Sequence, residues 1–202
     1  MLGDSSILTK IESTRMRAKN GNHIIEVWKK LLADIKNNRI FAAPIIHITS
    51  KQDMMNYRID VATGEDTETI SKFQMEMAKE SEGTELDYET VREGVKAVMT
   101  DETKGTYLVA KDGEGKILGS LLLTTEWSDW NNCPYYWIQS VYVKPENRRQ
   151  GVFRELFDFA RVIAQSEGAG ALRLYVDRNN PTAKEVYRAL GMKPSHYELF
   201  EL

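Results

Sequence analysis

The stretch Ile138-Gln-Ser-Val-Tyr-Val-Lys-Pro-Glu-Asn-Arg-Arg-Gln-Gly-Val-Phe-Arg-Glu-Leu156 decides the fold of this chain. An apolar, β-branched run ends at a proline, a short turn rich in cations follows, and Gly151 opens a segment with helical periodicity. The backbone N–H groups of a first helical turn have no intrahelical partner, and the helix dipole adds about half a positive charge there. Arg148, Arg149 and Arg154 add full charges. The stretch therefore predicts a phosphate or pyrophosphate site at a helix N-terminus.

Composition restricts the class of protein. The 202 residues are 42% apolar, enough for a buried core, and the formal net charge of −3 indicates neither a nucleic-acid partner nor an anionic membrane surface. Cys133 is the single cysteine, so an intrachain disulfide is excluded and a reducing compartment is favoured. We find no signal-peptide pattern and no apolar run near the roughly 20 residues of a membrane span. We therefore expect a cytoplasmic protein. The histidines are not spaced as metal ligands, so no metal is expected.

The first part of the chain differs from the rest in charge. Residues 1–56 carry nine Lys or Arg and five Asp or Glu, a net charge of +4, whereas residues 57–202 carry 18 and 25, a net charge of −7. Apolar residues between positions 23 and 37 have helical spacing, so we expect residues 1–56 to form an N-terminal extension with an amphipathic helix and an arm. We expect this extension to cover part of the following domain, to pair with a second subunit in a homodimer, or to be a leader; a solvated amphipathic helix is the alternative.

From Tyr57 onward the pattern becomes regular and defines one domain, residues 57–202. Strands are predicted at residues 57–62, 106–111, 116–125, 135–143, 171–176 and 196–201, with an irregular loop at 126–134. Helices are predicted to end near residues 80, 99, 167 and 190. The order β-α-α-β-β-β-α-β-α-β predicts an α/β fold with a mixed, mostly antiparallel sheet and helices on both faces. The crossover helix that begins near Gly151 makes its two flanking strands parallel.

Two motifs carry a resemblance to a known family. Arg148-x-x-Gly151-x-Phe153 follows a strand and opens a helix, and it resembles the acyl-CoA signature of the GNAT superfamily of N-acetyltransferases. The later segment Asn180-Pro-Thr-Ala-Lys-Glu-Val-Tyr187-Arg-Ala-Leu-Gly-Met resembles the closing motif of that family. The resemblance covers about residues 57–202 and not residues 1–56. It implies a GNAT-type fold, with acetyl-CoA as the co-substrate.

The resemblance also implies where acetyl-CoA binds. Backbone groups of Val141 and Val143 would pair with the pantetheine arm as another strand does. Asn180 would contact the cofactor or fix the turn into the last helix. The pyrophosphate would be held, mainly by backbone N–H groups, at Arg148, Arg149, Gln150, Gly151, Val152, Phe153 and Arg154. The chain departs from the family at Phe153, where Gly or Ala is usual, so this ring must point into the core or against the cofactor.

Acyl transfer needs an acid and a base. Tyr187 occupies the family position of the general acid that reprotonates the departing thiolate, and a phenol with a pKa of about 10 can give a proton to a thiol of pKa about 8.5. Without the motif, Tyr187 would read as a half-buried aromatic residue of a helix. A base must take the proton of the amine, and Glu126 is our first choice and Asp129 our second. A solvated loop carboxylate is the alternative for both.

The segment around these carboxylates is rich in aromatic residues. We expect Trp127, Asp129, Trp130 and Tyr135 to bind the acceptor, because aromatic faces beside carboxylates suit an ammonium group. A hydrophobic lid or a dimer contact would have the same composition.

The favoured function is an acetyl-CoA-dependent N-acetyltransferase. It would acetylate a primary amine of a small molecule by direct attack in a ternary complex, without an acyl-cysteine, because Cys133 lies outside both motifs. The alternatives are a non-catalytic acyl-CoA-binding module and an enzyme that acetylates a protein N-terminus or lysine.

Overall fold

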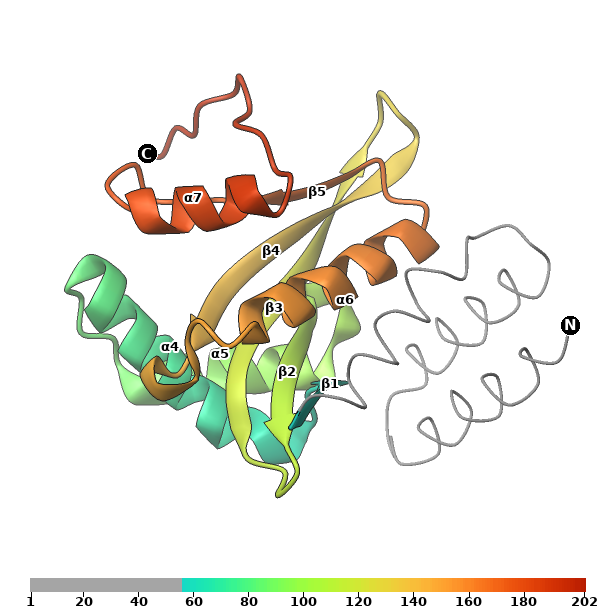
Figure 1. The fold of residues 1–202 in the computed structure, drawn as a ribbon. Helices are drawn as coiled ribbons and strands as arrows, with labels where there is room; N and C mark the ends of the chain where they lie inside the picture. Colours follow the sequence, from blue (N-terminus) through green and yellow to red (C-terminus); the bar gives the residue numbers. More distant parts are fainter. Residues whose placement is uncertain (1–55) are drawn as a thin grey trace, which may run out of the picture.

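The computed structural model describes residues 56–202 (Figure 1), so the predicted extension lies almost wholly outside the described residues. Within this range, no helix is long and apolar enough to cross a membrane. The elements, in chain order, are β1 (Tyr57–Val61), α4 (Thr67–Glu82), α5 (Tyr88–Thr100), β2 (Thr106–Asp112), β3 (Ile117–Ser128), β4 (Cys133–Val143), α6 (Val152–Ser166), β5 (Ala171–Leu174) and α7 (Pro181–Ala189). Short 3₁₀ turns at Gly64–Asp66, Glu102–Lys104 and Pro145–Asn147 complete the list.

The sheet has the predicted mixed character. Its strand order is β1-β2-β3-β4-β5, and every neighbouring pair is antiparallel except β4 and β5, which are parallel. Helix α6 connects these two strands and crosses one face of the sheet, whereas α4 and α5 lie on the other face (Figure 1). The predictions of helices on both faces and of a parallel pair around the crossover are therefore confirmed.

Side-chain alternation along the strands supplies two apolar cores. On the face covered by α6, Leu121 and Leu123 of β3 are buried together with Leu156 of the helix. On the opposite face, Leu122 of β3 packs against a cluster that includes Ile70 of α4. Successive residues of a strand point to opposite faces of the sheet. Within a strand segment without a bulge, odd-numbered and even-numbered residues therefore face different cores.

A β-bulge interrupts β4 near its carboxyl end. Gln139 pairs with Leu122 and Tyr142 pairs with Ser120, so Ser140 and Val141 together lie opposite one residue of β3. Ser140 has a φ of +50°, a left-handed conformation that is uncommon outside glycine. Such a bulge bends its strand and increases the local twist.

The pairing of β4 with β5 stops immediately before this bulge. The last paired residues are Ile138 of β4 and Leu174 of β5, and β4 continues to Val143 with no register partner in β5. We call this unpaired edge of β4, from Gln139 to Val143, the slot, and the turn into α6 follows it.

The structure corrects the prediction of a final strand at residues 196–201. The described chain has no strand after β5, and the apolar residues of the tail are exposed: Tyr197 is 66% exposed, Leu199 61% and Phe200 87%. An alternating pattern describes which side chains a strand could bury, but a strand also needs a neighbouring edge with which to pair. The tail has no such pairing here.

The structure also shortens the predicted loop at residues 126–134. Strand β3 continues through Ser128 and β4 begins at Cys133, with Glu126 opposite Tyr135 and Trp127 opposite Pro134. Cross-strand pairs involving large aromatic residues stabilise a ladder. They extend this hairpin beyond the point at which its apolar pattern ends.

The core makes a direct prediction about stability. Leu108 of β2 is completely buried on the α6 face. Its replacement in Leu108→Ala leaves a cavity, so the free energy of unfolding should fall by about 2–5 kcal/mol in urea denaturation. Leu86→Ala is the control, because Leu86 is 38% exposed and its change should stay near 0.5 kcal/mol. Equal losses in the two variants would contradict this account of the core.

Candidate active site

The N-terminus of α6 has the form expected of an anion site. Gly151 is the N-cap residue with a φ of +87°, and no side chain caps the helix. The first N–H with an acceptor on the helix is that of Glu155, which donates to the Gly151 carbonyl at 3.1 Å. The N–H groups of Val152, Phe153 and Arg154 precede it and can serve a ligand.

The need for glycine at position 151 comes from backbone conformation. A Cβ added there would come no closer than 3.6 Å to another atom of the protein, the Tyr57 hydroxyl. The left-handed φ, in contrast, disfavours any residue with a side chain. The preceding Arg149 also has a positive φ, of +60°. These left-handed residues aim the chain into α6.

The three arginines of the turn do not act alike. The Nε of Arg148 donates to the Val143 carbonyl at 2.8 Å, and its Nη2 donates to a Glu80 carboxylate oxygen at 2.6 Å. The charge of Arg148 is therefore compensated by α4, and this side chain ties the turn to β4 and α4. Arg149 and Arg154 are exposed and remain available for phosphate oxygens.

Other contacts of the turn are structural. The Gln150 amide donates to the Glu146 carbonyl at 2.7 Å. The Tyr142 hydroxyl donates to Glu76, and burial, followed by this hydrogen bond, raises the pKa of Tyr142. The Arg148 guanidinium lies 5.6 Å from the Tyr142 ring centroid. A network from α4 therefore supports the backbone that follows the slot.

Val141 and Val143, whose backbone groups are predicted to pair with the pantetheine arm, are half-buried against the core on the α6 face. Both lie in the part of β4 that has no pairing with β5. Val141 is also absent from the register with β3, because it belongs to the bulge. The Val143 carbonyl already accepts from Arg148, so one of its lone pairs is occupied. The backbone of Val141 is the more accessible partner for an arm in the slot.

Phe153 connects the two sequence motifs. Its ring packs against the α6-face core, lies 6.2 Å from the Phe157 ring, and meets the Tyr187 ring edge-on at a centroid distance of 5.8 Å. The phenylalanine in place of a small residue is therefore directed into the protein. Tyr187 of α7 is half-buried, and burial raises the pKa of its hydroxyl above the ordinary value of 10.0.

Asn180 has a structural role in the turn into α7. Its side-chain oxygen accepts the N–H of Ala183 at 2.9 Å, which caps the helix, and Pro181 occupies the first helical position. The Asn180 side chain thus caps the helix that carries Tyr187, and its contact with the cofactor stays a prediction.

Glu126 belongs to a polar and aromatic cluster on the other face of the sheet. One carboxylate oxygen accepts the indole N–H of Trp137 at 2.6 Å, and the other lies 3.7 Å from the Arg173 guanidinium. The Trp137 ring stacks on Tyr175 at 4.6 Å. The cluster therefore lies across β3, β4 and β5 beside the point where β4 and β5 separate.

The aromatic residues predicted to form the acceptor pocket are not all brought together. Tyr135 joins the cluster, since the Arg173 guanidinium lies 4.1 Å from its ring centroid. Trp127 is 63% exposed and Trp130 is 88% exposed, at the end of the β3–β4 hairpin. Asp129 lies in the turn beside them and is exposed. These three residues are displaced from the slot toward the hairpin tip.

Sequence reasoning missed Arg173. Leu172 and Leu174 alternate with Arg173 in the sequence, so a strand there puts Arg173 on the side opposite the two leucines. The missing information was which strand lies beside β5, because only the pairing with β4 brings Arg173 opposite Trp137.

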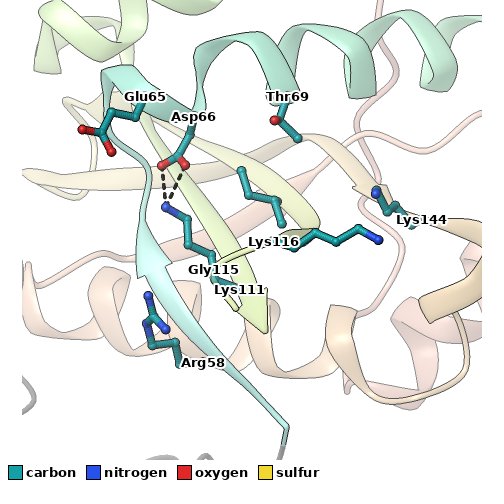
Figure 2. A pocket seen from close by; sticks show the side chains of 9 residues that line it. Arg58, Glu65, Asp66, Thr69, Lys111, Gly115, Lys116 and Lys144 are labelled. Carbon is teal, nitrogen blue, oxygen red and sulfur yellow. Dashed lines mark hydrogen bonds and ion pairs between the residues drawn. The ribbon is translucent and has the colours of Figure 1, made fainter. Parts of the chain in front are cut away.

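A separate cavity of about 500 Å³ lies near the β2–β3 turn and the start of α4 (Figure 2). Lys111 bonds to the Asp66 carboxylate in its wall, at 2.7 Å and 2.8 Å to the two oxygens. The cavity contains none of the predicted site residues. Its lining is Arg58, Glu65, Asp66, Thr69, Lys111, Gly115, Lys116, Ile117 and Lys144.

Comparisons with known proteins agree with this geometry. The model of the acetyltransferase (GNAT) family matches residues 67–192, more than half of the chain, so the chain belongs to this family of acetyltransferase enzymes. Membership implies acetyl-CoA as the co-substrate. A solved structure described as a possible acetyltransferase from Clostridium difficile 630 is 41% identical, with a TM-score of 0.69, over 73% of this chain and 97% of its own.

Two characterised relatives are more distant. Aminoalkylphosphonate N-acetyltransferase of Salmonella typhimurium is 28% identical over 136 residues, which are 67% of this chain and 84% of the relative. Thialysine N-epsilon-acetyltransferase of Bos taurus is 33% identical over 75 residues, which are 37% of this chain and only 44% of the relative.

The conformation of Gly151 gives a second prediction. Gly151→Ala forces a left-handed conformation on alanine, which should lower the free energy of unfolding by about 1–2 kcal/mol and weaken CoA binding measured by calorimetry. Gly94→Ala is the matched control. Gly94 lies inside α5 with open space around it, so alanine there should raise stability by about 0.5–1 kcal/mol. Changes of the same sign in both variants would contradict the prediction.

Proposed function

We propose that this enzyme transfers the acetyl group of acetyl-CoA to a primary amine of a small molecule, by direct attack in a ternary complex. One observation carries the proposal: the open N-terminus of α6 and the candidate acid Tyr187 are joined through the Phe153 ring, beside the slot between β4 and β5. An anion site, a backbone edge and a proton donor are the parts that a CoA thioester requires.

The residues present fit acetyl-CoA. The pyrophosphate would take the free N–H groups of Val152, Phe153 and Arg154, with the charges of Arg149 and Arg154. The pantetheine arm would lie in the slot along Val141, whose backbone is outside both strand ladders. The thioester would then face the cluster around Glu126 on the opposite side of the sheet.

These residues can supply the proton transfers that the reaction needs. The neutral amine attacks the thioester carbonyl, forming the C–N bond, and the Val141 N–H stabilises the developing oxyanion. Glu126 accepts the amine proton, directly or through a water. The C–S bond then breaks, and Tyr187 donates its proton to the departing thiolate. The products are the amide and free CoA; Glu126 then releases its proton to solvent, and the phenol of Tyr187 is reprotonated from solvent.

The names of the two characterised relatives support a small acceptor, since each refers to a small amine. A protein N-terminus or a lysine side chain stays an alternative. Peptides with a free N-terminus or an internal lysine, tested beside small amines in a CoA-release assay, would separate the two classes. Family membership favours the enzyme over a non-catalytic CoA-binding module.

Tyr187→Phe tests the proposal. Loss of the general acid should lower kcat for CoA release by about 100-fold or more, while the affinity for CoA measured by calorimetry is unchanged. Tyr197→Phe in the exposed tail is the control and should retain full activity. If Tyr187→Phe keeps the activity of the unchanged enzyme, Tyr187 is not the acid.

The pH dependence of this variant is a second readout. Because burial raises the pKa of Tyr187, its proton-donating form persists above pH 10 and is lost only as the pH passes the raised value. Between pH 7 and 9, the ratio of kcat in the unchanged enzyme to kcat in Tyr187→Phe should therefore stay constant. A ratio that falls steeply within this range would contradict the assignment.

Glu126→Gln tests the base. The glutamine can still accept the hydrogen bond of Trp137 but cannot take a proton, so kcat should fall by about 100-fold. Glu114→Gln, at the exposed β2–β3 turn, is the control. A comparable loss in Asp129→Asn with normal activity in Glu126→Gln would assign the base to Asp129 instead.

A further inference from the structure

We propose that the acceptor amine also carries an anionic group, a carboxylate or a phosphonate, and that Arg173 binds this group and sets the specificity of the enzyme. The inference rests on the proposed function and deepens it. It follows from the position of Arg173, from the contacts that hold its guanidinium, and from the donors that these contacts leave free.

Arg173 lies beside the slot and on the acceptor side of the sheet. It pairs in register with Trp137 and is one residue, about 3.3 Å along the strand, before the last pair of β4 and β5. Its neighbours Leu172 and Leu174 pack into the α6-face core, so Arg173 points to the opposite face. Trp137 and Glu126, with which it interacts, lie on that same face.

Aromatic side chains hold the guanidinium in place. It lies 4.1 Å from the Tyr135 ring centroid and 5.4 Å from that of Trp137. Trp137 is itself held by its hydrogen bond to Glu126 and its stacking on Tyr175. Stacking on a ring face uses the plane of the guanidinium and leaves its N–H edge free, so the group is preorganised for a ligand.

The N–H donors of Arg173 are unused within the described residues 56–202. Its only ion pair there is with Glu126, at 3.7 Å, too long for a hydrogen bond. The side chain is 32% exposed, so a ligand can reach it.

Other arginines of this protein show what a satisfied pair looks like. Four of them donate to a carboxylate at short distance: Arg58 to Asp60 at 2.7 Å, Arg92 to Glu68 at 2.6 Å, Arg148 to Glu80 at 2.6 Å, and Arg161 to Asp158 at 2.8 Å. The pair of Arg173 with Glu126 is about 1 Å longer than each of these. A guanidinium with free, coplanar donors binds a carboxylate or phosphonate through two parallel hydrogen bonds.

The arrangement also gives the acceptor a direction. An amine that is linked to an acid by a short chain can place its acidic group on Arg173 and its amine toward the slot. Arg173 would therefore distinguish acidic amines from neutral amines of equal length.

The test measures binding separately from turnover. Calorimetry with the CoA-loaded full chain compares three amines of similar length: 4-aminobutanoate, 3-aminopropylphosphonate and the neutral 4-aminobutan-1-ol. We expect at least one of the two acids to bind at least 10-fold more tightly than the alcohol. Arg173→Gln should abolish this preference without changing the affinity for the alcohol, and Arg173→Lys should retain part of it. The control Arg161→Gln, on the exposed surface of α6, should retain all of it.

Two outcomes would overturn the proposal. One is equal affinity of the unchanged enzyme for acids and alcohol. The other is a loss in Arg173→Gln that affects the acids and the alcohol alike, as a purely structural role would produce. The relative affinities of the two acids identify which acidic group is preferred. Absence of CoA release with every amine would reject the proposed function, whereas the binding preference tests Arg173 by itself.

Discussion

The end of the pairing between β4 and β5 is the constraint on which the rest of this structure depends. Strand β5 ends at Leu174, whereas β4 continues to Val143 and is bent by the bulge at Ser140 and Val141, shortly after its last pair with β5. The bulge places two residues opposite one, and the left-handed φ of Ser140 is its local cost. The backbone of β4 from Gln139 to Val143 therefore has no neighbouring strand on the β5 side, and the turn into α6 follows it. Phe153, in the first turn of α6, packs against Tyr187, so the candidate anion site and the candidate acid are in contact through this ring.

The slot divides the candidate site between the two faces of the sheet. Phe153 and Tyr187 lie with α6 and α7, whereas Glu126 and Arg173 lie on the face that α4 and α5 cover elsewhere. In the proposed reaction, the groups assigned to the acetyl donor and to the acceptor amine would therefore lie on opposite faces of the sheet. The contacts of Arg148 with Val143 and Glu80 join the turn beside the slot to β4 and α4, so one of the three arginines expected at the phosphate supports the backbone of this turn.

Much of the fold could be predicted from local patterns. The alternation in β2 and β3, the N-cap Asp87 before α5, and the sequence Asn180-Pro181 before α7 each express a preference that their own neighbours determine. The predicted final strand at 196–201 failed because pairing is not a local property. The hairpin of β3 and β4 is longer than predicted for the same reason, since Glu126 and Trp127 extend the strand through partners on β4.

The sequence by itself determined the family of this protein, the order of its elements from β1 to α7, the glycine turn that opens α6 and the position of Tyr187 in the closing motif. These features follow from residue types at fixed spacing, because local backbone preferences depend on residue type. Only the tertiary structure decided that Phe153 contacts Tyr187, that Arg148 is held by Glu80, and that Arg173 faces Glu126. Those contacts join residues from different elements, and their geometry depends on strand register and on the bulge. A one-residue change in register would move each side chain of a strand to the other face of the sheet. A local sequence pattern therefore cannot specify these contacts between elements.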